Sequence, residues 1–191
     1  MPYKFDPAKI EKLNSPGRLV DLNPDAMWRV TSPPDNAVFV EIGAGTGVFA
    51  TQFARRMTGG RVYAADTMPQ MIDYMREHLP ADVRGTVVPL PSQPTRVPLP
   101  DAQADVVFMV NVHHELDDRA ATLREAYRLL KPGGVVMLAD WRKAETPKGP
   151  PIAARIDAAD AARELEAAGF ADVQQHEDLP YAWLLTARRE G

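Results

Sequence analysis

The chain has 191 residues, of which 45% are hydrophobic and 25% charged, a balance typical of one globular domain with a sizeable core. The formal net charge of −4 disfavours a nucleic-acid partner, and the lack of cysteine excludes disulfides, cysteine-ligated zinc and thiol catalysis. No apolar run is long enough to span a membrane and the N-terminus has no apolar signal core. We therefore expect a single cytoplasmic domain over residues 1–191.

The first 36 residues are rich in proline and predict a helical N-terminal extension ahead of a core at residues 37–187. The aromatic residues Tyr3, Phe5 and Trp28 suggest that this extension folds over a site as a lid that excludes water.

The core begins with an apolar strand at residues 37–42 and continues through a glycine-rich turn into a helix over residues 47–57. In the turn, three glycines alternate with two small residues: Gly43, Ala44, Gly45, Thr46 and Gly47. Without a Cβ atom, glycines let the backbone bend sharply and approach a ligand, and the following helix directs free N–H groups at it. In the dinucleotide fingerprint the third small residue comes one position later. The spacing therefore favours a nucleoside without a phosphate.

The remaining elements alternate between strands and helices. In chain order they are a strand at 61–65, a helix at 68–79, strands at 83–90 and 105–112, a helix at 118–130, a strand at 134–139, a helix from Asp157 to near Gly169, and strands at 172–177 and 181–187. This alternation predicts a mostly parallel sheet with helices on both faces. Pro89 places its strand at an edge, because proline lacks a ladder donor. The short connection between the last two strands predicts an antiparallel pair.

Four features carry a family resemblance: residues 41–47, Asp66 at the end of the second strand, residues 97–101 and residues 129–134. Their order and spacing resemble the class I S-adenosylmethionine-dependent methyltransferases, and within them the small-molecule enzymes of ubiquinone and menaquinone biosynthesis. The residues after the fourth strand, His113 and His114, strengthen this likeness, which covers residues 37–187. It implies a Rossmann-like doubly wound sheet of seven strands in the order 3-2-1-4-5-7-6, with the last strand antiparallel. It also implies S-adenosyl-L-methionine as cofactor and in-line transfer of its methyl group to a small-molecule acceptor.

The resemblance implies a cofactor site made of the turn and the ends of neighbouring strands: Glu41, Gly43, Ala44, Gly45, Thr46, Gly47, Asp66, Thr67, Met68, Gln93 and Asn111. Glu41 and Asn111 flank the methionine end, Asp66 accepts the ribose hydroxyls, and Thr67 and Met68 pack on the adenine. Gln93 stands where relatives usually carry an aspartate. Two structural alternatives stay open: Asp66 as a helix cap and Glu41 as an acceptor for neighbouring backbone N–H groups.

His113 and His114 are the candidate catalytic residues, because histidine is the usual base at neutral pH if the acceptor must lose a proton. Adjacent side chains point in different directions, so at most one should face the acceptor. The alternative for each is a hydrogen bond to nearby backbone or a helix end. Asp140 and Trp141, at the end of the fifth strand, are further candidates for the acceptor pocket. We expect no metal site at residues 113–115, because consecutive side chains do not readily converge on one ion.

Two functions of other classes remain open. One is a non-catalytic protein that binds S-adenosylmethionine as a partner or sensor, and the other is a nicotinamide-dependent oxidoreductase. Nucleic-acid methylation is disfavoured, since residues 111–114 lack the Asn/Asp-Pro-Pro-aromatic motif of base-amino methyltransferases. The sequence indicates neither the acceptor nor the oligomeric state.

Overall fold

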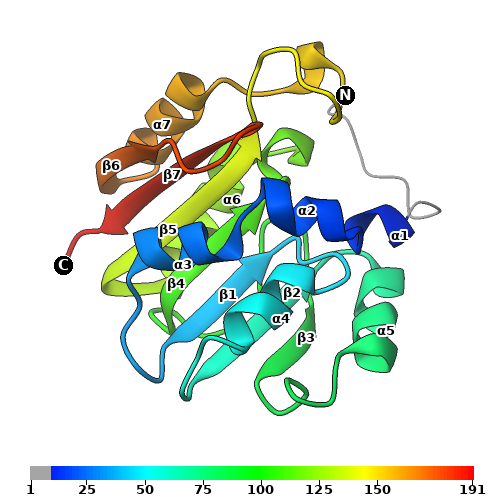
Figure 1. Cartoon of the computed structure of the whole chain (residues 1–191). Helices are drawn as coiled ribbons and strands as arrows, with labels where there is room; N and C mark the ends of the chain where they lie inside the picture. The colour runs from blue at the N-terminus through cyan, green and yellow to red at the C-terminus, as the bar shows by residue number, and fades with distance from the viewer. Residues whose placement is uncertain (1–9) are drawn as a thin grey trace.

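A seven-stranded sheet in the order β3-β2-β1-β4-β5-β7-β6 organises the protein, in a computed structural model that describes residues 10–191 (Figure 1). The strands are β1 Val38–Ile42, β2 Arg61–Asp66, β3 Val87–Pro91, β4 Ala104–Val110, β5 Leu130–Trp141, β6 Phe170–His176 and β7 Ala182–Arg189. The first five pair in parallel, and β7 runs antiparallel to both β5 and β6. The predicted fold, strand order and antiparallel last strand are confirmed.

The helices begin in different ways, and only in some of them does a side chain cap a free N–H group of the first turn. They are α1 Ile10–Leu13, α2 Pro16–Asp21, α3 Pro24–Thr31, α4 Val48–Ala54, α5 Pro69–His78, α6 Arg119–Leu129 and α7 Ala158–Ala167, with short 3₁₀ turns η2 His113–Glu115 and η3 Ile152–Ala154. Asp118 accepts a hydrogen bond from the Ala121 N–H at 2.8 Å, and Asp157 accepts one from the Ala159 N–H at 3.0 Å. The predicted start at Asp157 is therefore confirmed.

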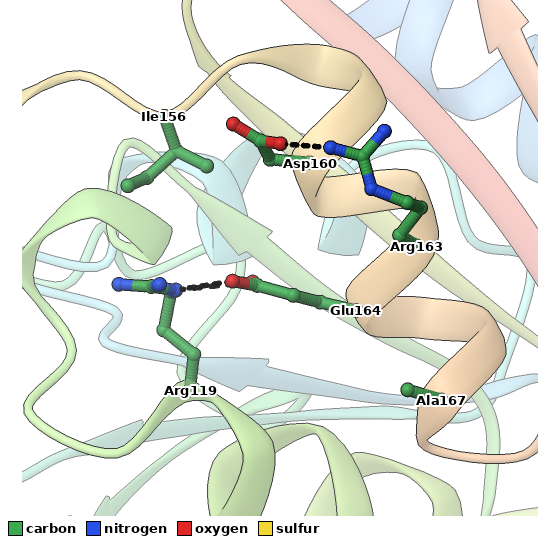
Figure 2. A pocket seen from close by; sticks show the side chains of 6 residues that line it. All are labelled: Arg119, Ile156, Asp160, Arg163, Glu164 and Ala167. Atoms are coloured by element: carbon green, nitrogen blue, oxygen red, sulfur yellow. Dashed lines mark hydrogen bonds and ion pairs between the residues drawn. The ribbon is translucent and has the colours of Figure 1, made fainter.

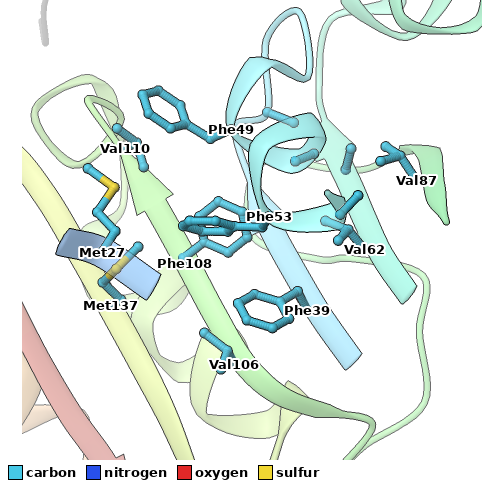
Figure 3. Packing of buried hydrophobic residues seen from close by; sticks show 14 of the residues in the cluster. Met27, Phe39, Phe49, Phe53, Val62, Val87, Val106, Phe108, Val110 and Met137 are labelled. Atoms are coloured by element: carbon cyan, nitrogen blue, oxygen red, sulfur yellow. The ribbon is translucent and has the colours of Figure 1, made fainter. Parts of the chain in front are cut away.

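Two apolar layers bury the two faces of the sheet. On one face, aromatic rings of α4 and the central strands interlock, with Phe53 and Phe108 centroids 4.7 Å apart (Figure 3). On the other face, α6 and α7 pack against β4, β5 and β7. Trp28 of α3 stacks on Phe39 with ring centroids 5.6 Å apart. Trp28 thus packs its half-buried ring against the first layer, and the lid itself stays a prediction.

Most strand boundaries differ from the sequence prediction by one or two residues, and the starts of two strands differ by four. β3 begins at Val87 rather than at residue 83, because helix-like turns hold residues 80–87: the Val87 N–H donates to the Val83 carbonyl at 2.8 Å. β5 begins at Leu130 rather than at residue 134, since Leu130 already pairs with Ala104 before a register shift. β3 lies at an edge of the sheet, as its proline predicted.

Tyr3 and Phe5 lie outside the described residues. Among residues 10–191, no helix has both the length and the apolar character needed to cross a membrane.

Candidate active site

A cavity of about 980 Å³ opens at the carboxyl ends of β1, β2 and β4, and is called the main cavity below. This edge is where ligands bind in open parallel sheets. The main cavity is lined by most of the predicted cofactor residues: Glu41, Gly43, Ala44, Gly45, Asp66, Thr67, Met68, Gln93 and Asn111. The other two support the turn from behind. Thr46 donates its hydroxyl hydrogen bond to Asn14 Oδ1 at 2.8 Å, and Gly47 is the N-cap of α4.

The turn after β1 depends on left-handed backbone that favours glycine. Gly43, Gly45 and Gly47 have φ angles of 74°, 55° and 75°. A Cβ atom at Gly45 would lie 3.1 Å from Leu13 Cδ1 of α1, so a side chain there would press on the N-terminal segment. The glycine turn therefore exposes its backbone to the main cavity, while α1 packs closely against the turn.

Asp66 joins the turn to the end of β2. Its Oδ2 accepts a hydrogen bond from the Gly45 N–H at 2.7 Å, and its Oδ1 accepts one from the Met68 N–H at 2.9 Å. Burial raises the pKa of Asp66 above its usual value, and these backbone hydrogen bonds oppose that shift. Asp66 therefore accepts hydrogen bonds from the backbone as a cap does, and it also lines the main cavity.

Glu41 is the most strongly perturbed carboxyl group in the site. Only 2% of it is exposed, and its Oε2 accepts a hydrogen bond from the Ala50 N–H of α4 at 3.0 Å. Burial raises its pKa well above the usual value, while the charge of Arg18 and the Ala50 N–H act in the opposite direction. Both predicted roles stay compatible: Glu41 caps backbone and lines the main cavity.

Replacing Glu41 with glutamine should stabilise the unliganded protein at neutral pH. The folded state holds the Glu41 proton to higher pH than the unfolded state does, so stability falls as pH rises from the usual glutamate pKa through the raised one. Glutamine removes this penalty and keeps an acceptor for Ala50. We expect thermal melting to give a higher Tm for the Glu41→Gln variant than for the wild-type protein at neutral pH.

The Tm difference between the Glu41→Gln variant and the wild-type protein should shrink as the pH is lowered toward the usual glutamate value. The exposed Glu166 of α7, changed to glutamine, is the matched control and should leave Tm nearly unchanged. A lower Tm for Glu41→Gln at neutral pH would contradict the assigned burial cost.

Asn111 gives the main cavity a hydrogen-bond acceptor for a ligand that can donate. It follows β4 with a φ of 57°, and its N–H donates to the Ala139 carbonyl at 2.8 Å. Within residues 10–191, its buried Oδ1 has no hydrogen-bond partner. A buried acceptor without a donor is costly unless a ligand supplies one. An unpaired acceptor in the lining of the main cavity fits a ligand that carries an ammonium group, as S-adenosylmethionine does.

The side chains of the two histidines point in different directions, because both residues lie in the 3₁₀ turn η2. His113 is 1% exposed, and its Nε2 lies 2.7 Å from Glu164 Oε2 of α7. Burial alone would raise the pKa of Glu164, but hydrogen bonds from His113 and Arg119 hold it below its usual value. His113 thus faces α7 and does not line the main cavity, the alternative given above for each histidine.

His114 lines the main cavity and is held by Asp140 at the end of β5. Its Nδ1 lies 2.7 Å from Asp140 Oδ1, and its main-chain N–H donates to Asp140 Oδ2 at 3.0 Å. A carboxylate only accepts, so Nδ1 carries a proton in this hydrogen bond. Nε2 lies 3.6 Å from Glu115 Oε1. Asp140 therefore supports the cavity wall from behind His114, while Trp141 lines the cavity as predicted.

A second pocket, of about 300 Å³, lies between α6 and α7 (Figure 2). Its charged side chains pair with one another: Arg119 Nε donates to Glu164 Oε1 at 2.8 Å, and Arg163 pairs with Asp160. The Arg119–Glu164 pair joins α6 to α7, and His113 Nε2 of η2 contacts the same Glu164 carboxylate.

The loop after β5 forms the wall of the main cavity through Trp141, Lys148, Gly149 and Pro150. Arg155, 4% exposed, holds this loop by donating to backbone carbonyls. Its guanidinium reaches the carbonyls of Pro150 at 2.9 Å, Arg142 at 3.0 Å and Ala144 at 2.7 Å. It also lies 5.6 Å from the Trp141 ring centroid. The loop is thus held in one shape beside the cavity.

The N-terminal segment of α1 and α2 covers the turn and contributes side chains that the sequence did not reveal as site residues. Lys12, Leu13, Ser15, Arg18, Asp21 and Leu22 line the main cavity. Asn14 joins this segment to α5, since its Nδ2 donates to the Tyr74 hydroxyl at 2.8 Å. The opposite wall gains Tyr181, also missed. These residues come from segments distant in sequence, without a local motif.

Comparison with known proteins agrees with this geometry. A family model described as a methyltransferase domain matches residues 40–138. The chain belongs to this family. A crystal structure of a SAM-dependent methyltransferase from Aquifex aeolicus is 30% identical, with a TM-score of 0.89, and the match covers 97% of this chain and 100% of that one. The resemblance to class I S-adenosylmethionine-dependent methyltransferases is confirmed.

Curated methyltransferases match over shorter regions. A malonyl-[acyl-carrier protein] O-methyltransferase of Serratia marcescens is 36% identical over 51% of this chain and 36% of its own length. A ubiquinone/menaquinone biosynthesis C-methyltransferase of a Caulobacter species is 31% identical over 64% of this chain and 51% of its own. The match thus spans about half or less of the length of these two relatives.

Proposed function

We propose that this member of the methyltransferase family transfers a methyl group from S-adenosylmethionine to a small-molecule acceptor. The observation that carries the proposal is the main cavity, which is lined both by most of the predicted cofactor residues and by His114, Trp141 and Tyr181. When bound, S-adenosylmethionine supplies a methyl group on a positively charged sulfur that is already a good leaving group. The protein therefore has to bind, align and exclude water.

Each part of the cavity has a task in this proposal. Glu41 and the Asn111 Oδ1 receive the ammonium end, the bare turn lets the backbone approach, and Asp66 accepts hydrogen bonds from the ribose. Thr67, Met68 and Gln93 line the part left for the adenine. We further propose that α1 and α2 act as a lid over this end, as their contacts with the turn suggest.

At the acceptor end, we propose His114 as the general base. With Nδ1 held by Asp140, Nε2 would take the proton of an acceptor hydroxyl, or the proton that an acceptor amine loses, when the acceptor bonds to the methyl group and S-adenosylhomocysteine leaves. His113 is left out of this role because its ring nitrogen binds Glu164.

The test is methyl transfer from radiolabelled S-adenosylmethionine to a panel of acceptors. The panel holds a hydroquinone, a phenol, an amine and a malonyl thioester on its carrier protein, the last because a relative's name includes it. Label transferred to one acceptor class, together with measurable S-adenosylhomocysteine binding, supports the proposal. Binding without transfer to any acceptor would favour the non-catalytic alternative, and affinity for NAD but not for S-adenosylhomocysteine would favour the oxidoreductase.

A further inference from the structure

An ion pair joins α2 to the loop after β5. Lys148 Nζ of this loop pairs with Asp21 Oδ2 at the end of α2, and both residues line the main cavity. The Lys148 ammonium also lies close to Gly17 of the same helix, where an added Cβ atom would be 3.8 Å from Nζ. Two segments of the cavity lining are therefore held together by a contact between charged side chains.

The loop side of this contact is firmly held. The Lys148 carbonyl accepts hydrogen bonds from Thr146 Oγ1 at 2.6 Å and from Arg155 Nη2 at 3.4 Å. The next residue, Gly149, packs so closely on the Trp141 ring that a Cβ atom there would lie 2.9 Å from Trp141 Cδ2. If the contact opens, we therefore expect α2 to move and the loop to stay in place.

The helix on the other side is held mainly at its two ends. None of the six residues of α2 is fully buried. Directly after α2, Leu22 is 3% exposed and belongs to the first apolar layer. Before it, Asn14 bonds to Thr46 of the glycine turn and to Tyr74 of α5. The chain is thus fixed on both sides of a surface helix, which the ion pair ties to the loop.

The ion pair is of a kind that opens easily. The Lys148 side chain is 49% exposed and the Asp21 side chain 15%. A pair that reaches water contributes little to stability and is screened by salt. The contacts of Asn14 are uncharged, so salt should act on the Lys148–Asp21 contact and spare the attachment of the segment to the turn.

We propose that the Lys148–Asp21 ion pair is a gate for the acceptor, which opens for the acceptor and its methylated product and closes during transfer. This inference rests on the proposed function. The loop that carries Lys148 also supplies Trp141 and Pro150 to the cavity wall, on the side proposed for the acceptor. Movement of α2 away from this loop would admit an acceptor there, while Asn14 keeps the segment on the glycine turn.

Access of a small quencher to Trp141 tests the gate without any ligand. The contribution of Trp141 is the difference in acrylamide quenching between each protein and the same protein carrying Trp141→Phe. Asp21→Lys and Lys148→Asp each bring like charges together, so we expect stronger quenching in both. The combined variant restores opposite charges and should return quenching to the wild-type value. Added salt should raise quenching in the wild type, because salt screens the pair.

Arg55→Asp is the matched control for charge reversal. Arg55 at the end of α4 pairs with Asp82 at 2.8 Å, both side chains are about half exposed, and neither residue lines the main cavity. This variant should leave the quenching of Trp141 unchanged.

Turnover gives a second readout once the labelling panel has identified an acceptor. Each single reversal should raise the KM for that acceptor by up to about fivefold, the change that corresponds to an exposed ion pair, without changing affinity for S-adenosylhomocysteine. The combined reversal should restore the KM. Because the chain has no cysteine, Asp21→Cys with Lys148→Cys creates the only two thiols. Joining them with a short bismaleimide that has a reducible linker should stop turnover, and reduction should restore it.

Unchanged quenching of Trp141 in both single reversals would overturn the gate, and so would full turnover in the cross-linked protein. Affinity for S-adenosylhomocysteine that falls as much as the acceptor KM rises would also overturn it, because the pair would then support the cofactor site. Failure of the wild type to bind S-adenosylhomocysteine is a different result, which contradicts the proposed function. The quenching comparison needs no ligand and would still show whether the pair controls access to the cavity.

Discussion

The Asp66→Asn variant is expected to bind S-adenosylhomocysteine about 100-fold more weakly than the wild-type protein. The Asp66 carboxylate accepts the N–H groups of Gly45 and Met68 and also faces the main cavity. Asparagine has one acceptor oxygen in place of two, so its amide NH₂ must face a backbone N–H or the ligand's hydroxyl hydrogens. Either placement removes a hydrogen bond, and the turn loses the contact that holds Gly45 in position.

Isothermal titration with S-adenosylhomocysteine measures this loss, and circular dichroism shows whether the variant is folded. Asp73→Asn is the matched control, because Asp73 lies exposed on α5 and pairs only with Arg76, at 3.3 Å, among the contacts of the described chain. Its affinity should equal that of the wild type. If Asp66→Asn retains full affinity in a folded protein, Asp66 is a cap for the backbone and not part of the cofactor site.

The second large effect concerns turnover. With an acceptor identified by the labelling panel, His114→Gln should lower kcat by roughly 100- to 10,000-fold, the usual contribution of a general base. The cofactor residues are untouched by this change, so affinity for S-adenosylhomocysteine should stay close to that of the wild type. The split between turnover and cofactor binding separates a base from a residue that only supports the cavity.

The pH dependence gives an independent readout. A histidine acting as base must be unprotonated, so the wild-type rate should fall toward acidic pH, and the variant should lose this limb. Asp140→Asn should have a similar effect on kcat, because it removes the group that fixes the tautomer of His114. His176→Gln on β6, where the ring nitrogen binds the Thr186 hydroxyl at 2.8 Å, is the control. Unchanged kcat in His114→Gln would show that the acceptor needs no base at this position.

The sequence was most informative where the chemistry is local. The glycine turn could be predicted from the spacing of a few consecutive residues, and all three glycines adopt a left-handed backbone conformation. Asp66 could be placed because it ends a clearly apolar strand, and Pro89 placed β3 at the edge through its missing donor. In each case the physical reason lies within one element.

What the sequence did not reveal is which candidate residues contact one another across distant segments. His114 and Asp140 are 26 residues apart and meet because β4 and β5 pair in parallel with Val110 opposite Ala139. Strand patterns indicate that two such strands exist but do not fix that register. Arg18 had no periodic or motif signal either. Its position in the cavity follows from the packing of α2 over the turn, which only the folded chain reveals.

The direction of the two histidines is a third case. In an extended chain the two side chains would point to opposite faces. Here both histidines lie in a 3₁₀ turn, in which Glu164 contacts His113 and Asp140 contacts His114. The sequence therefore supported the expectation that at most one histidine faces the acceptor, while the choice of His114 needed both partners in place.

The way in which Arg155 holds the loop after β5 has a consequence for divergence among related enzymes. Its donors contact main-chain oxygens of Arg142, Ala144 and Pro150, and these oxygens are present whatever side chains the positions carry. Mutations in the loop can therefore alter the chemistry presented to an acceptor without changing the path of the backbone. As long as Arg155 is kept, substitutions at those loop positions would change the acceptor preference without a change in the backbone.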